Sequence, residues 1–163
     1  MSRFLPELET VLRALADEHR RLLAHVESQQ AAMKAFNLKA MDDARNQQEA
    51  SRLRVASLES KRRSIVAHVA KGLKPEGPLT LTRIADLHPP RRQALLALRD
   101  EIKQLAEAIA TRSHIAGRLA SSVLGHLNTV VRLLAGAVEK AGLYTKHGVP
   151  RVSGRIGVME AVG

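Results

Sequence analysis

The chain has no cysteine and no tryptophan, and aromatic residues make up only 2% of its 163 residues. The lack of cysteine excludes a disulfide framework, a thiol nucleophile and a thiolate metal site. Aromatic side chains usually supply much of the volume of a compact core. Their scarcity predicts a thin core between helices, built from Leu, Ala, Val and Ile.

Long apolar runs are missing as well. No stretch approaches the roughly 18 apolar residues that indicate a membrane-spanning helix. The first ten residues, MSRFLPELET, already include charged side chains and hold no apolar segment typical of a signal peptide. We therefore expect a cytoplasmic protein with no membrane span.

Positive charge is abundant, with a formal net charge of +10. Such a charge favours nucleic acid or an acidic membrane surface as a partner. The basic residues are dispersed among acidic ones, however, and no aromatic platform for stacking bases accompanies them. A basic helical nucleic-acid-binding protein is therefore an alternative function, and nucleic acid is not the partner that we expect.

Apolar residues recur three and four positions apart along most of the chain, which is the period of amphipathic helices. The pattern predicts three helices, over about 4–36, 38–71 and 89–142. Asn37 is expected to cap the turn between the first two. Glycine and proline break the chain in a linker over 72–88, where Thr80 or Thr82 is expected to cap one short helical turn.

The predicted fold is all-α, with an antiparallel helical hairpin and a long third helix forming a coiled-coil-like three-helix bundle. We expect one helical domain over 1–143 and a flexible tail over 144–163. At 1.5 Å per residue the third helix would be roughly 80 Å long, which exceeds the length of either earlier helix. Its most apolar part, 119–138, must be covered either by the hairpin or by another chain.

Residues that carry enzyme chemistry are not arranged in any recognisable pattern. Seven histidines are present, but none has the spacing of a metal-binding helix motif. Glycine-rich phosphate-binding loops are also missing. We therefore expect no catalytic, cofactor-binding or metal-binding residues, no cofactor and no enzymatic activity.

Three short motifs add a family resemblance. They are LTLTRIADL at 79–87 after the Gly/Pro break, NTVVRLL at 128–134, and LYTKHG at 143–148 before a Val/Gly/Arg tail. With the helix layout, the chain resembles the FlgN family of flagellar type III export chaperones. These are small cytoplasmic helical proteins that hold the hook-associated proteins, which form the hook–filament junction, and prevent their premature assembly.

The resemblance implies a client-binding surface and a docking residue. The surface would take an amphipathic client helix, a mode of recognition that needs an apolar helix face. Its expected residues are Leu119, Val123, Leu127, Val130, Val131, Leu134 and Val138. Tyr144 is the expected contact to the flagellar export gate. Without a client, an uncovered apolar face favours a homo-oligomer. A structural coiled-coil component remains a further alternative.

Overall fold

The computed structural model describes residues 4–73 and 77–140, and in these ranges the protein is all-α, as predicted. Its helices are α1 (Phe4–Lys34), α2 (Leu38–Leu73), α3 (Leu81–Asp86) and α4 (Pro89–Lys140). The chain divides into two compact units, 1–119 and 120–163. The single domain over 1–143 therefore stays a prediction, and the predicted tail, 144–163, lies outside the described residues.

The predicted helix bounds are close to those observed. The first helix ends at Lys34 rather than at 36, the second extends to Leu73, and the third is described as far as Lys140. The predicted linker is not wholly irregular, because it contains α3. Thr80 is the N-cap of α3, and its side chain accepts a hydrogen bond of 3.2 Å from the amide of Arg83. One of the two caps that the sequence offered is thereby confirmed.

The turn between α1 and α2 is set by its local hydrogen bonds. The amide of Phe36 donates to the carbonyl of Met33, and that of Asn37 donates to the carbonyl of Ala32. This pair of bonds is the Schellman arrangement that ends a helix. The Asn37 side chain then accepts a 3.0 Å hydrogen bond from the amide of Ala40. Asn37 therefore caps α2, as the sequence predicted.

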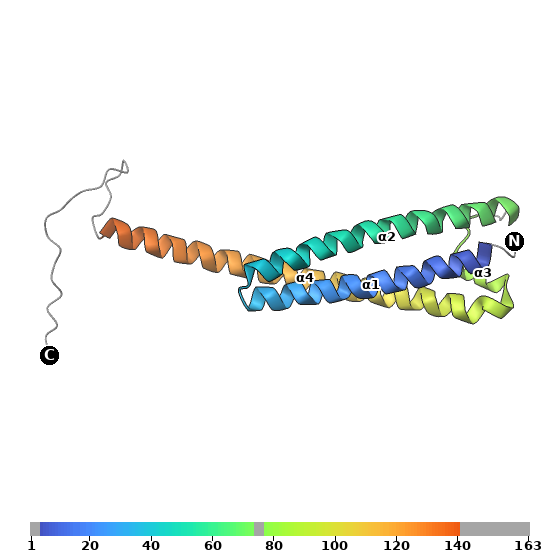
Figure 1. Cartoon of the computed structure of the whole chain (residues 1–163), viewed down its shortest axis with the longest axis horizontal. Coiled ribbons are helices and arrows are strands. Elements are labelled where there is room, and N and C mark those ends of the chain that lie inside the picture. Colours follow the sequence, from blue (N-terminus) through green and yellow to red (C-terminus); the bar gives the residue numbers. More distant parts are fainter. Residues whose placement is uncertain (1–3, 74–76, 141–163) are drawn as a thin grey trace. The chain divides into compact units, whose positions relative to one another are not determined.

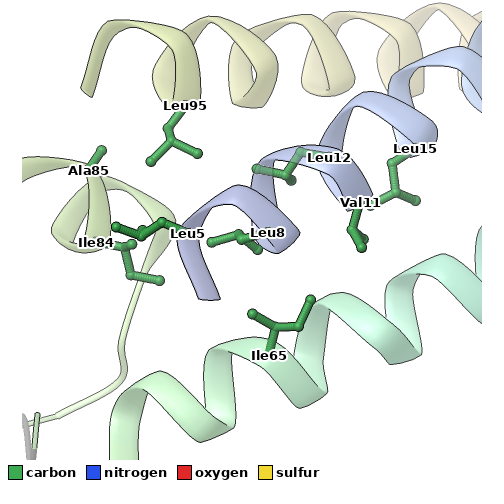
Figure 2. Close-up of a cluster of buried hydrophobic side chains, with 9 residues drawn as sticks. All are labelled: Leu5, Leu8, Val11, Leu12, Leu15, Ile65, Ile84, Ala85 and Leu95. Carbon is green, nitrogen blue, oxygen red and sulfur yellow. The ribbon is translucent and has the colours of Figure 1, made fainter. Parts of the chain in front are cut away.

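The core of the first unit is an aliphatic seam where four helices meet (Figure 2). Leu8 and Leu12 of α1 are almost completely buried, as are Ile84 of α3 and Leu95 of α4, and Ile65 comes from α2. Each such side chain removed from water contributes about 2 kcal/mol. α1 lies alongside both α2 and the N-terminal part of α4 (Figure 1). The short helix α3 is thus part of the core and not only a connector.

Polar contacts fix the register of α4 against α1 in the same unit. Glu9 and Arg91 form an ion pair of 2.6 Å, and Arg20 pairs with Glu101. Further along, the side-chain amide of Gln30 donates a 2.6 Å hydrogen bond to the carbonyl of Arg112. These contacts are spread over most of the length of α1, so they specify one register between the two helices.

Candidate interaction surface

The candidate binding residues lie on α4, and most of those with described side chains are exposed. Leu127, Val130, Val131 and Leu134 are exposed by 52%, 45%, 63% and 62%. Leu119 and Val123 are half-buried. The side chain of Val138 and the whole of Tyr144 lie outside the described residues.

Two further leucines belong to this surface and were not among the predicted site residues. Leu124 is 62% exposed and Leu133 is 69% exposed. Leu124 lies three positions before Leu127 and seven before Val131, both of them predicted residues, and this helical spacing was the signal that would have placed it. Six residues therefore form what we call the α4 surface: Leu124, Leu127, Val130, Val131, Leu133 and Leu134.

The opposite side of the same helix is polar or small. At 3.6 residues per turn, Ser121, Gly125, Asn128 and Arg132 fall on the side away from the α4 surface. The hydroxyl of Thr129 donates a 3.0 Å hydrogen bond to the carbonyl of Gly125, within the helix. Residues 120–137 are therefore amphipathic, which is the pattern of a helix that buries one side against a partner.

The segment between Glu107 and Glu139 carries charge of one sign. No Asp or Glu occurs between Glu107 and Glu139, whereas Arg118 and Arg132 are both exposed. His126 is exposed beside the apolar side chains. The segment therefore carries the positive charge of Arg118 and Arg132 on the side away from the α4 surface, and its overall charge attracts an acidic partner better than a basic one.

A second cluster of note lies between α1 and α2, but it is satisfied internally. Glu18 is 3% exposed and accepts hydrogen bonds from Ser51 at 2.7 Å and from Arg54 at 2.8 Å. Burial raises the pKa of Glu18, but these hydrogen bonds and the charges of Arg54 and Arg21 together lower it by more, so its pKa lies below the usual value. Arg21 completes the pairing at 3.2 Å. This arrangement ties two helices together and points to no ligand.

The described part of the chain holds no cluster of metal-binding groups. Among residues 4–73 and 77–140, no three His, Asp or Glu side chains gather closely enough to hold a metal ion. His19 and His68 each place a ring nitrogen within 2.8 Å of the carbonyl four residues earlier in their own helix. Across these same ranges, no helix has the length and hydropathy needed to cross a membrane.

Comparison with known families gives a match over most of the chain. A family model described as FlgN protein matches residues 1–151. Searches among curated proteins and among solved structures give no match. Since the family match covers most of the 163 residues, the chain belongs to the FlgN family, a family of flagellar export chaperones.

Proposed function

We propose that this chaperone binds hook-associated proteins through the α4 surface and keeps them from assembling before export. Membership of the family supports a chaperone role for flagellar proteins. The observation that carries the proposed site is the exposure of the α4 surface, whose six side chains are exposed by between 45% and 69%. A monomeric protein rarely leaves a contiguous aliphatic patch uncovered unless that patch binds something.

The physical basis of binding would be burial of aliphatic surface. Each Leu or Val side chain that a client removes from water contributes about 2 kcal/mol. Several such positions together offset the several kcal/mol lost when two molecules associate. A client helix with its apolar side on α4 cannot use that side to contact its neighbours in a filament. Binding therefore prevents premature assembly.

The proposed docking contact is separate from the client surface. Tyr144 is the one tyrosine of the sequence, and it lies outside the residues that the structure describes. We propose that it contacts the export gate once the client is bound, a role that rests on the family resemblance and on the frequency with which tyrosine anchors interfaces.

The first test is co-purification with the hook-associated proteins of the same organism. The full chain should give a one-to-one complex, and a chain lacking residues 119–163 should give none. A finer variant pair, Leu127→Glu with Leu134→Glu, should also abolish binding, because it places charge on the α4 surface. Leu53→Glu is the matched control, since Leu53 is a 65% exposed leucine on α2 and should leave binding unchanged.

Two outcomes would contradict the proposal in different ways. A complex that survives both the truncation and the paired substitution would place the client elsewhere. The absence of any complex, together with salt-sensitive DNA binding, would favour the nucleic-acid-binding alternative that the +10 charge suggests.

For Tyr144→Ala, retained client binding with lost gate docking is expected, and loss of client binding would contradict the separate docking role.

A further inference from the structure

The α4 surface is too wide for one partner helix. Together with Val123 and His126, its residues form two parallel rows, each with a spacing of three, four and three positions. The first row is Val123, His126, Val130 and Leu133, and the second row is Leu124, Leu127, Val131 and Leu134. Each row by itself has the spacing of a coiled-coil seam, which is the strip that one helix covers.

Together the two rows cover about half of the helix circumference. At roughly 100° per residue, the positions from Leu133 round to Leu124 span an arc of roughly 180° of the helix surface. Both ends of the arc are open, with Leu133 exposed by 69% and Leu124 by 62%. A helix that contacts Leu133 therefore leaves Leu124 in water.

The earlier part of α4 provides an internal comparison. Positions that precede the first row by multiples of seven hold large apolar residues, such as Ile102, Leu105 and Ile109. Positions that precede the second row in the same way hold small or charged residues, namely Lys103, Ala106, Ala110, Ser113 and Gly117. Ile102 of that single row packs on a core to which both α1 and α2 contribute. A segment with two apolar rows needs at least two helical neighbours.

Charge identifies the chemistry of those neighbours. A second copy of this chain would bring the same formal net charge of +10. Two such chains repel each other, although weakly at physiological ionic strength. Helices of negative net charge are attracted instead, so the occupant is the client and not a second chaperone.

We propose that residues 120–137 of α4 bind two amphipathic helical segments of one client at the same time. One segment lies along the first row and the other along the second row, and the two together carry a net negative charge. This inference rests on the proposed function, since it assumes that the α4 surface is where the client binds. It adds that the client must present a pair of helices rather than one.

The test uses the two edges of the arc separately. Leu133→Glu disturbs only the first row, and Leu124→Glu disturbs only the second row. Affinity for a purified, full-length hook-associated protein is measured by calorimetry, with Leu53→Glu as the control. Each edge variant should weaken binding about tenfold or more, because a charge is buried on binding, while the control should match the unaltered chain. Equal far-UV circular dichroism of all variants excludes misfolding as the cause.

Photo-crosslinking identifies which client segment lies at each edge. A photoreactive residue placed at position 124 and another at position 133, in separate samples, should crosslink to two different segments of the client. Crosslinks from both positions to one segment, loss of affinity in only one edge variant, or crosslinks between two chaperone copies would each overturn the inference while leaving client binding intact. Absence of any complex with the unaltered chain would overturn the proposed function itself.

Discussion

Ser51 donates a 2.7 Å hydrogen bond to the carboxylate of Glu18 across the interface between α1 and α2. Arg54 donates to the same oxygen at 2.8 Å, and Glu18 is 3% exposed. A buried carboxylate is tolerated only when its hydrogen-bonding capacity is met. The pairing of the first two helices thus depends on a polar contact at a specific position and not only on aliphatic packing.

Substitutions at this contact should destabilise the protein by different amounts. Glu18→Gln should lower the free energy of unfolding by about 2 kcal/mol, and Ser51→Ala by about 1 kcal/mol, because the second leaves the Arg54 contact in place. Glu49→Gln, at an exposed position of α2, should change it by less than about 0.5 kcal/mol. Urea unfolding followed by circular dichroism measures all three, and equal midpoints for Glu18→Gln and Glu49→Gln would contradict the assigned role.

Acidification should lower the free energy of unfolding through the carboxylate of Glu18. The pKa of Glu18 is lowered in the folded protein from a value of 4.5, so the unfolded chain takes up a proton more readily. Its contribution is fully present above pH 4.5 and is lost as the pH falls through the lower folded pKa. The pKa of Glu9 is lowered too, first by its hydrogen bond from Arg13.

The measurement is the free energy of unfolding between pH 7 and pH 3 in the unaltered chain and in Glu18→Gln. Both should lose stability on acidification, and the variant should lose less because it lacks one of the two carboxylates, Glu9 and Glu18, whose pKa is lowered in the folded protein. Parallel curves of unfolding free energy against pH for the two proteins would show that folding does not change the pKa of Glu18.

Phe36 offers a position where a smaller residue should stabilise the protein. Its φ is 52°, in the left-handed region, and its side chain is 65% exposed. The left-handed backbone costs a residue with a Cβ about 1–2 kcal/mol, and glycine avoids that cost. Phe36→Gly should therefore raise the free energy of unfolding by about 1 kcal/mol. Phe36→Ala keeps the Cβ and should raise it little, and equal gains for both variants would show that the backbone strain is not the cause.

Helix propensity should control the local stability of residues 120–137. A Cβ added at Gly125 meets no atom within 4 Å, so Gly125→Ala should stabilise the helix by about 1 kcal/mol. Amide hydrogen exchange of neighbouring residues should slow about fivefold in consequence. Ala135→Gly, at an exposed position of the same segment, should accelerate exchange by a similar factor. No change in either variant would mean that tertiary contacts, and not propensity, hold this segment.

Local features were predictable from the sequence because their causes are local. The periodicity of Leu, Val and Ile predicted all three long helices, and the side chains of Asn37 and Thr80 cap the helices where the sequence placed them. The burial of Glu18 was not predictable, because it depends on which α2 residues come opposite it. For the same reason nothing in the sequence indicated that Ile84 would be completely buried.

The candidate surface was only partly predictable. The sequence pattern identified Val130, Val131 and Leu134 but omitted Leu124 and Leu133, which the structure shows to be as exposed as the predicted residues. A single sequence gives the spacing of apolar residues but not which of them another helix covers. Tyr144 and the tail after it stay predictions, since they lie outside the described residues.

The turn at Phe36 and Asn37 has a consequence for the order of folding during synthesis. This turn joins two helices that are neighbours in sequence. By contrast, the hydrogen bond between α1 and α4 joins Gln30 to Arg112, which are separated by 82 positions. Contacts between sequence neighbours form sooner, because less chain has to be ordered to make them. We expect the α1–α2 hairpin to form while α4 is still being translated, so the ribosome releases the aliphatic rows of α4 only after an ordered scaffold exists.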